Sequence, residues 1–480
     1  MFGGTGNDGG SDLQLTSDGG AIIVGTTNGF GNPLSKITLV RLNQIGDTIW
    51  TQNFGSAGGE IGRFVNATTD GGTVFTGYSS GTSDVTIGRT DSTGNLLWAK
   101  SVSSPDAMES RMVLQTADGG FIFGFEGFQI RLMKTDANGD TLWTSKISGA
   151  SGARLNDIKQ TTDGGYIITG TASNSSNNVG MLLLKLDATG NEVWNYTYGG
   201  SQEEEGVSVL QTSDGGYIAA GSEFQSFGTN GDIYVVRVDS LGNIIWSKTY
   251  ETAADDKSFS ICQAADQGFV ITGFTNSSGT DACMLKIASN GTLQWSKSFG
   301  GSANDLFRTV KQTSDGSFLS IGSTASIAAG NFNMYLVKCD SLGDGLCNQT
   351  NLVTTEHTVT SIRSNATLTV SHDLQIGAKT LTSARGVAVT HVCGGIGIDE
   401  NAGFERLKIY PNPFNDKIKI TPTHANGELT IYDVKGKMIK NVPSSDDETI
   451  VDSRDLVPGV YFVDYKWNDT SIKTRIVKTE

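Results

Sequence analysis

The sequence has little of what helical, membrane-spanning or disulfide-rich proteins need. Only 18% of its 480 residues are charged, it has seven prolines and five cysteines, and no apolar run reaches the length of a membrane helix. An odd number of cysteines in so long a chain excludes a disulfide scaffold. Lys and Arg number 35 against 50 Asp and Glu, and the resulting net charge of −15 argues against a nucleic-acid partner.

Motifs of catalysis are also missing. The sequence has no phosphate-binding loop, no His-Glu-x-x-His, no paired Cys-x-x-Cys and no nucleophile elbow, and residues 1–347 contain no histidine. Ser/His/Asp catalysis is therefore not expected there. His357, His372 and His391 follow, but without the spaced cysteines or carboxylates of a metal site. We expect no cofactor and no firm metal site.

Glycine, by contrast, is abundant, with 62 residues, and it marks a repeat. Asp-Gly, once Asp-Gln, recurs in a fixed context at intervals of about 50 residues, and a tryptophan follows it in step. Two markers with one period predict seven units. The hairpin aspartates are Asp18, Asp70, Asp118, Asp163, Asp214, Asp266 and Asp315, and the tryptophans are Trp50, Trp98, Trp143, Trp194, Trp246 and Trp295.

One unit contains four short strands. In the fifth, apolar runs at 207–211, 217–221, 233–238 and 244–250 are separated by glycine turns and one polar loop. The third run is nearly continuous in apolar character, which predicts a sheet buried on both faces. A four-stranded sheet covered on both faces by its own copies is a blade of a β-propeller. We expect the tryptophans to fill the gaps between neighbouring blades.

The fifth unit, VLQTSDGGYIAAGS followed by GDIYVVRVDSLGNIIW, looks like a propeller blade of the WD-repeat type. It lacks that family's Gly-His and Trp-Asp dipeptides. It more closely resembles the Asp-Gly-Gly-Tyr repeats of secreted proteins of the Bacteroidota. We therefore predict an all-β chain whose residues 1–347 form a seven-bladed β-propeller of four-stranded blades.

The repeat ends at Cys347, where a tryptophan is due. Residues 348–403 are rich in Thr, Val and Ser, and they predict a linker or an irregular β segment. Cys347 and Cys393 are the candidate pair for a disulfide in an oxidising compartment, and closing that loop would stabilise the fold by roughly 3 to 4 kcal/mol. Cys262, Cys283 and Cys339 lie within strands, where we expect them to pack as small apolar groups.

Residues 404–480 are predicted to form a separate domain. Five of the seven prolines lie there, and residues 401–480 carry 12 basic and 12 acidic side chains, so the rest of the chain holds the whole net charge. Short alternating strands between turns predict a small immunoglobulin-like β-sandwich. We expect it to fold independently and to join the propeller near 395–405.

This domain resembles the type A C-terminal sorting domain of the type IX secretion system. The resemblance implies export by that secretion machinery, outer-membrane passage, and removal of the domain by a sortase-like protease with release or anchoring at the cell surface. It is carried by an opening motif, a middle motif, a late motif and a basic last strand. Their residues are Tyr410, Pro411, Asn412, Pro413 and Phe414; Gly436 and Lys437; Pro458, Gly459 and Tyr461; and Lys473 and Lys478.

Export also needs an N-terminal signal peptide, and residues 1–4 have neither a basic start nor an apolar stretch. Residues 2–8 align instead with residues 299–305, which end a fourth strand. We expect a truncated start, or a stub that pairs with the seventh blade and helps to close the ring.

Acidic residues recur ten positions before the hairpin aspartates, in five of the seven units. If they face one another across the mouth of the central channel, they form a ring that could bind a ligand or, weakly and collectively, calcium. Alternatively, each carboxylate accepts hydrogen bonds from its own connection and fixes the entry into the inner strand. These residues are Asp8, Glu60, Glu204, Asp256 and Asp305.

The function that we expect is a secreted or surface-anchored, non-enzymatic module that binds a glycan or a protein. Loops that differ between the units, such as 222–232, gather on one face of the disc, where binding usually lies, although loops also vary where nothing constrains them. Two alternatives stay open. One is a glycosidase or lyase with carboxylates at the channel mouth, and the other is a purely structural surface protein.

Overall fold

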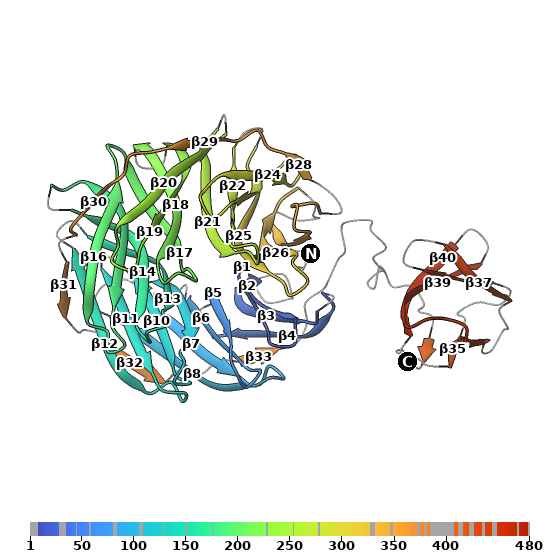
Figure 1. The fold of residues 1–480 in the computed structure, drawn as a ribbon. Coiled ribbons are helices and arrows are strands. Elements are labelled where there is room, and N and C mark those ends of the chain that lie inside the picture. Colours follow the sequence, from blue (N-terminus) through green and yellow to red (C-terminus); the bar gives the residue numbers. More distant parts are fainter. Residues whose placement is uncertain are drawn as a thin grey trace. The chain divides into compact units, whose positions relative to one another are not determined.

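A computed structural model describes most of the chain as β strands, which confirms the all-β prediction (Figure 1). Within this described part, no helix is long or apolar enough to cross a membrane. The structure describes residues 8–27, 35–44, 46–56, 59–79, 84–104, 109–127, 129–149, 152–174, 176–226, 229–252, 254–276, 279–326, 332–345, 349–366, 368–371, 375–378, 382–384, 408–410, 416–421, 427–433, 437–443, 449–467 and 470–478. The chain divides into two compact units, residues 1–388 and 389–480.

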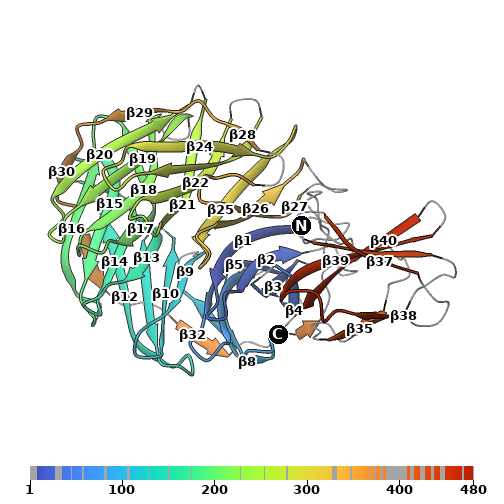
Figure 2. The ribbon, with the colours of Figure 1, turned by 45° about the vertical axis from the view of Figure 1, so that its right-hand side comes forward.

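The first unit consists of seven antiparallel sheets, numbered 1 to 7 in chain order, which follow one another around a ring (Figures 1 and 2). The first, or inner, strands are β1 (Asp8–Leu15), β5 (Glu60–Ala67), β9 (Glu109–Gln115), β13 (Ala153–Gln160), β17 (Glu203–Gln211), β21 (Asp256–Gln263) and β25 (Asp305–Gln312). The second strands are β2 (Ala21–Thr27), β6 (Thr73–Ser79), β10 (Phe121–Glu126), β14 (Tyr166–Ser173), β18 (Tyr217–Ser226), β22 (Phe269–Thr275) and β26 (Phe318–Thr324). The third strands are β3 (Lys36–Leu42), β7 (Val85–Thr90), β11 (Ile130–Thr135), β15 (Val179–Leu186), β19 (Thr229–Val238), β23 (Asp281–Ile287) and β27 (Asn333–Cys339). The fourth, or outer, strands of sheets 1 to 6 are β4 (Thr48–Gly55), β8 (Leu96–Ser103), β12 (Thr141–Gly149), β16 (Glu192–Gly199), β20 (Ile244–Glu251) and β24 (Leu293–Phe299).

The Asp-Gly turns join the first two strands of every sheet, as the repeat predicts. In sheet 5, Asp214 accepts hydrogen bonds from the Thr212 hydroxyl, at 2.7 Å, and from the Gly216 amide, at 3.2 Å. Arg237 on the third strand then clamps the same carboxylate at 2.6 Å. Each sheet repeats this pair between the turn and its third strand. The pairs are Asp18–Arg41, Asp70–Arg89, Asp118–Lys134, Asp163–Lys185, Asp214–Arg237, Asp266–Lys286 and Asp315–Lys338.

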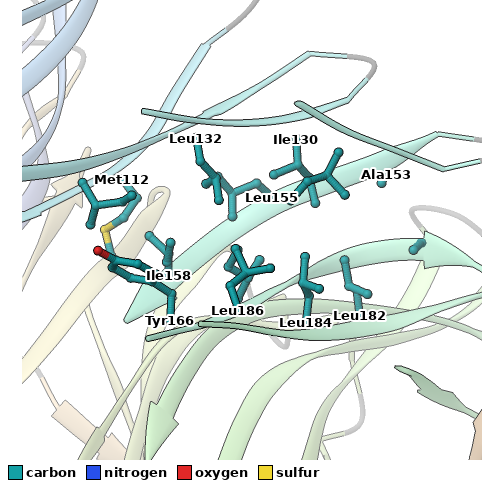
Figure 3. Close-up of a cluster of buried hydrophobic side chains, with 14 of the residues drawn as sticks. Met112, Ile130, Leu132, Ala153, Leu155, Ile158, Tyr166, Leu182, Leu184 and Leu186 are labelled. Atoms are coloured by element: carbon teal, nitrogen blue, oxygen red, sulfur yellow. The ribbon is translucent and has the colours of Figure 1, made fainter. Parts of the chain in front are cut away.

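Neighbouring sheets pack face to face through apolar side chains. Between sheets 3 and 4, Leu132 and Ile130 face Leu155, Leu182 and Leu184 in one buried cluster (Figure 3). The tryptophans lie at the outer part of these gaps, where the Nε1 atoms of Trp50, Trp246 and Trp295 donate hydrogen bonds to turn carbonyls of the following sheet at 3.0–3.3 Å. The predicted packing role of the tryptophans is therefore confirmed.

The ring closes between sheets 7 and 1. Strand β1 contacts β25, β26 and β27, and the Thr309 hydroxyl on β25 donates a buried hydrogen bond of 3.0 Å to Asp12 on β1. The last sheet thereby bonds to the first sheet, which lies about 300 residues earlier in the chain.

Residues 349–384 form a belt of six short strands around the outside of the ring (Figure 1). Each belt strand pairs antiparallel with the outer strand of one sheet, from sheet 6 back to sheet 1. An outer strand has unpaired N–H and C=O groups along its free edge, and the belt satisfies part of them. The belt strands are β28 (Gln349–Asn351), β29 (Thr355–Thr358), β30 (Ile362–Ser364), β31 (Leu368–Ser371), β32 (Gln375–Ala378) and β33 (Thr382–Ala384).

A seven-residue period matches the belt to the spacing of the sheets. Leu352, Val359 and Ala366 each join a core cluster between two adjacent sheets. Polar contacts add to this packing, because Glu356 forms an ion pair of 2.9 Å with Lys248 on β20 and also accepts a hydrogen bond from the Leu293 amide of sheet 6. The belt therefore links neighbouring sheets as well as covering their edges.

The second unit has two sheets around one apolar core. One sheet has the order β34-β35-β38 and the other the order β37-β36-β39-β40. Ile418, Ile431, Val463 and Ile476 lie in the shared core and are fully buried. The strands are β34 (Lys408–Tyr410), β35 (Lys417–Thr421), β36 (Glu428–Asp433), β37 (Met438–Pro443), β38 (Thr449–Asp452), β39 (Gly459–Trp467) and β40 (Thr470–Lys478).

The structure moves one predicted boundary. The sequence left a linker or an irregular β segment open for 348–403, and six short strands between residues 349 and 384 agree with the second of these; they belong to the first unit, which extends to Ala388 rather than ending at 347. The physical reason is the edge pairing of the belt. Cys347 and Cys393 lie outside the described residues, as do residues 2–7 of the N-terminal stub, whereas Cys262, Cys283 and Cys339 are buried free thiols, as predicted.

We expect the Glu356→Ala substitution to loosen the belt. It removes the ion pair to Lys248 and an acceptor for the Leu293 amide, and should lower the free energy of unfolding by about 1 kcal/mol. Hydrogen exchange should accelerate in β29 and β20 but not in the inner strands. Glu356→Gln is the matched control, because it keeps an acceptor without the charge. Unchanged exchange in both variants would mean that the belt is held by its backbone pairing alone.

We also expect limited proteolysis with a protease of broad specificity to cut the chain between residues 385 and 407 and to leave two folded fragments. Each unit has a complete apolar core of its own, so neither needs the other to bury its side chains. Mass spectrometry would locate the cut, and calorimetry of the fragments would show two separate transitions. Complete digestion of either fragment at the same protease concentration would refute independent folding.

Candidate functional site

Every inner strand carries a β-bulge at the same position. One residue of each strand has no partner in the register with the second strand, and neighbouring residues on both sides are paired. A bulge turns its extra side chain away from the regular alternation of the strand. The bulge residues are Ser11, Arg63, Arg111, Asn156, Val207, Phe259 and Arg308.

All seven bulge residues line one central cavity of about 340 Å³. Residues from all seven inner strands contribute to this cavity, so it lies on the axis of the ring. Six basic side chains line it, against three acidic ones, although the chain as a whole is strongly acidic. The basic residues are Arg63, Arg111, Lys159, Lys257, Arg308 and Lys311, and the acidic ones are Asp12, Asp157 and Glu205.

Three arginines occupy the bulge position in sheets 2, 3 and 7. Arg63 lies 3.3 Å from Glu109, and Arg111 forms an ion pair with Glu126. Arg308 has neither a hydrogen bond nor an ion pair with another described residue, and its guanidinium carbon lies 4.6 Å from the centre of the Phe259 ring. Burial, followed by the positive charges of Arg63 and Arg111, lowers the pKa of Arg308. The positive charge of Arg308 is therefore close enough to Arg63 and to Arg111 to be repelled by both.

The bulge positions of sheets 4, 5 and 6 are uncharged, although Lys159 and Lys257 also line the cavity from sheets 4 and 6. Val207 and Phe259 hold the bulge position in sheets 5 and 6, and Phe224 lies nearby with Lys257 5.1 Å from its ring centre. In sheet 4, the Asn156 amide donates hydrogen bonds to Glu205 and to the Gly206 carbonyl at 2.9 and 2.7 Å. The bulge positions thus supply three arginines from sheets 2, 3 and 7, and an amide and two apolar side chains from sheets 4 to 6.

The carboxylates Asp12 and Asp157 hold adjacent sheets together. Asp12 accepts hydrogen bonds from the amides of Leu13 and Val65 at 2.8 and 3.1 Å, as well as the bond from Thr309 described above. Asp157 accepts the Val209 amide at 3.0 Å and pairs with Lys159 at 2.5 Å. The bonds from Val65 and Thr309 to Asp12 and from Val209 to Asp157 cross from one inner strand to the next, so both carboxylates help to hold the ring together.

The structure places none of the five predicted acidic ring residues among the residues that line the cavity. Each is at most 2% exposed. Glu60, Glu204, Asp256 and Asp305 each bind a group four residues earlier in the chain: the Ser56 hydroxyl at 2.6 Å and the amides of Gly200, Thr252 and Gly301 at 2.6–3.0 Å. Asp8 accepts a hydrogen bond from the Thr27 hydroxyl.

These contacts support the alternative that the sequence also offered, in which each carboxylate fixes the entry into its inner strand. The carboxylates of four of these residues turn back to the connections before their strands, whereas Asp8 bonds to the second strand of its own sheet. The acidic ring at the channel mouth stays a prediction. Among the residues that the structure describes, no group of three or more His, Cys, Asp or Glu is placed to hold a metal ion. Calcium binding stays an untested prediction.

The positions of the seven bulge residues can be aligned from the sequence repeat, but the sequence did not lead to their prediction as a site. Each bulge residue stands seven positions before its hairpin aspartate, so the repeat that identified the acidic positions also aligns the bulges. The seven bulge residues share no chemistry, however, and alignment by residue type does not select them. Only the break in strand register identifies the position.

Of the sorting-domain residues, Tyr410 ends β34, Lys437 precedes β37, and Gly459 and Tyr461 begin β39 after Pro458. Lys473 and Lys478 lie on β40, the last strand. Pro411, Asn412, Pro413, Phe414 and Gly436 lie outside the described residues.

Two family models match the chain. Residues 408–479 match the secretion system C-terminal sorting domain, and residues 35–222 match the model described as outer membrane protein assembly factor BamB. The chain therefore ends in the sorting domain of the type IX secretion system, and its repeats form a β-propeller. It is a secreted protein that the secretion machinery recognises through this domain. No curated protein matches the sequence.

Three solved structures are similar in fold. PorZ, a surface component of the type IX secretion system of Porphyromonas gingivalis, shares 9% identity over all of this chain and 75% of its own, with a TM-score of 0.37. A protein of unknown function from Bacteroides caccae shares 13% over 58% of this chain and 93% of its own, with a TM-score of 0.38. Sqt1 from Chaetomium thermophilum shares 11% over 74% of this chain and 88% of its own, with a TM-score of 0.45. Likenesses this low carry no functional argument.

We expect the Glu204→Gln substitution to stabilise the protein at high pH. Burial raises the pKa of Glu204 to about 8, whereas in the unfolded chain it returns to the usual value near 4.5. The protonated carboxyl of the folded protein therefore contributes its full stabilisation below about pH 4.5, and this contribution is lost as the pH rises through about 8. At pH 9 the variant should exceed the wild type by on the order of 1 to 3 kcal/mol, with little difference at pH 5.

Urea unfolding at the two pH values measures this. Glu192→Gln, at an exposed glutamate of β16, is the matched control and should behave as the wild type does. An equal difference between wild type and Glu204→Gln at both pH values would refute the raised pKa.

Proposed function

We propose that this exported protein is a non-enzymatic binding module and that its ligand binds in the central cavity. In this proposal the seven sheets are the blades of a seven-bladed propeller, and the second unit is an immunoglobulin-like sandwich that serves export. The observation that carries the proposal is the ring of seven bulges, which directs one side chain from every blade to the same cavity.

The composition of the ring supports binding rather than a purely structural role. A residue that only had to fill the axis would be small or apolar in every blade, but the bulge position holds three arginines, an asparagine, a serine, a valine and a phenylalanine. Bulges are common next to functional sites, because they aim a side chain that the regular strand would turn elsewhere. The surrounding hydrogen-bonded sheets keep these side chains on a rigid frame.

The size of the cavity favours a compact ligand. A volume of about 340 Å³ is at the lower end of small-molecule sites, so a short stretch of glycan or the tip of a protein segment fits inside it. A larger glycan or protein would insert one end and contact the loops around the mouth. Export places such a site outside the cell, and the type IX machinery and a sortase-like protease would be its partners on the way.

A glycosidase or lyase is the less favoured function. Such an enzyme needs two carboxylates that face the substrate at a set separation. Asp12 and Asp157 are held in the bonds between the blades, and the buried acidic residues of the connections do not reach the cavity. Glu205 is the remaining carboxylate of the lining, and it accepts the hydrogen bond of Asn156.

We expect the full chain to bind at least one compound on a glycan and peptide array, and we expect the Val207→Trp substitution to abolish that binding. The indole would occupy much of the cavity beside the bulge ring. Val193→Trp, at an exposed valine on outer strand β16, is the matched control and should bind as the wild type does. Binding that survives Val207→Trp would place the site elsewhere, and release of a cleaved product from the bound ligand would favour the enzyme.

A further inference from the structure

Three arginines at the bulge position form one basic side of the cavity. Arg308 comes from sheet 7, Arg63 from sheet 2 and Arg111 from sheet 3. Only sheet 1 lies between Arg308 and Arg63 around the ring. Sheet 1 contributes Ser11, preceded by two glycines, and all three small residues line the cavity. The strand between Arg308 and Arg63 therefore adds no bulky side chain to this part of the lining.

This arrangement costs stability in the empty protein. Like charges in a partly desolvated cavity repel one another, and the pKa of Arg308 is lowered by burial and by its two neighbours. No carboxylate in the described part of the chain offsets the charge of Arg308, although Glu109 and Glu126 are available to the other two arginines. A buried positive charge without an acidic partner in the protein is expected where a ligand supplies the anion.

We propose that the three arginines bind an oxyanion carried by a small ligand, as a carboxylate, a sulfate ester or a phosphate ester. This inference rests on the proposed function and names the chemistry that the cavity selects. Guanidinium groups present donors in a planar fork that matches such oxygens, and several of them can converge on one anion. The pairs with Glu109 and Glu126 orient Arg63 and Arg111 and leave Arg308 as the uncompensated positive charge.

The uncharged lining residues indicate what the rest of the ligand is like. Val207 and Phe259 add apolar surface to the cavity, with the Phe259 ring directly beside Arg308, and the Asn156 amide is already bonded within the protein. A compact ligand body with some apolar surface therefore fits beside the anionic group. An acidic sugar has this form.

The test is isothermal titration calorimetry of the full chain at fixed ionic strength with four glucose derivatives. Glucose is the neutral probe, and glucuronate, glucose 6-sulfate and glucose 6-phosphate carry the three anionic groups on the same ring. We expect at least one anionic probe to bind at least tenfold more tightly than glucose. The arms also distinguish a carboxylate site from a sulfate or phosphate site.

Arg308→Gln should weaken the binding of that probe at least tenfold, whereas Arg454→Gln, at an exposed arginine of the second unit, should leave it unchanged. A second readout does not depend on any ligand: without anions at low ionic strength, Arg308→Gln should unfold at a higher temperature than the wild type, because a repulsive charge is gone. A lower unfolding temperature would mean that Arg308 stabilises the empty fold.

The outcomes separate this inference from the proposed function. If glucose binds as tightly as the anionic probes and Val207→Trp abolishes both, the cavity is a binding site but does not select an anion. If no anionic probe binds the wild type, or if Arg308→Gln binds it unchanged, the oxyanion site is refuted. Anion binding that survives Val207→Trp would refute the cavity as the site and the proposed function with it.

Discussion

Face-to-face packing between neighbouring sheets is the constraint on which the rest of the structure depends. The middle strands of each sheet are buried on both faces, so a sheet at either end of an open row would expose one apolar face. Closing the row into a ring removes both ends at once. The hydrogen bond from Thr309 to Asp12 lies at that closure, and it joins inner strands that are nearly 300 residues apart in the chain.

Two further features follow from the ring. Inner strands that converge on one axis bring their side chains close together. A bulge in each strand breaks the register with the second strand and turns one residue toward the axis, where the cavity forms. Outer strands diverge and leave free edges, and the belt pairs with those edges on six of the sheets. The cavity and the belt are therefore consequences of the same geometry, at opposite edges of the sheets.

Charge is distributed to suit this geometry. The hairpin aspartates pair with a basic residue of the third strand in every sheet, and the acidic residues of the connections are buried in local hydrogen bonds. Both of these sets of acidic residues thus have ion-pair or hydrogen-bond partners within their own sequence repeat. The basic groups at the axis do not share this pattern, since Arg308 has no acidic partner among the described residues, and this contrast is the basis of the proposed anion site.

The sequence by itself determined the seven units, their strands and turns, the packing of the tryptophans and the sorting domain, because each of these is local and recurs at a fixed spacing. It could not determine the partners of residues 349–384, because strands of three or four residues have no pattern that identifies an edge up to 330 residues away. It put the acidic residues just ahead of the inner strands, whereas they are the first or second residues of those strands, and it could not say which way their side chains turn. The bulges were likewise hidden, because a break in register exists only between two paired strands. Tertiary structure alone decided which side chains reach the axis, and the functional proposal depends on those.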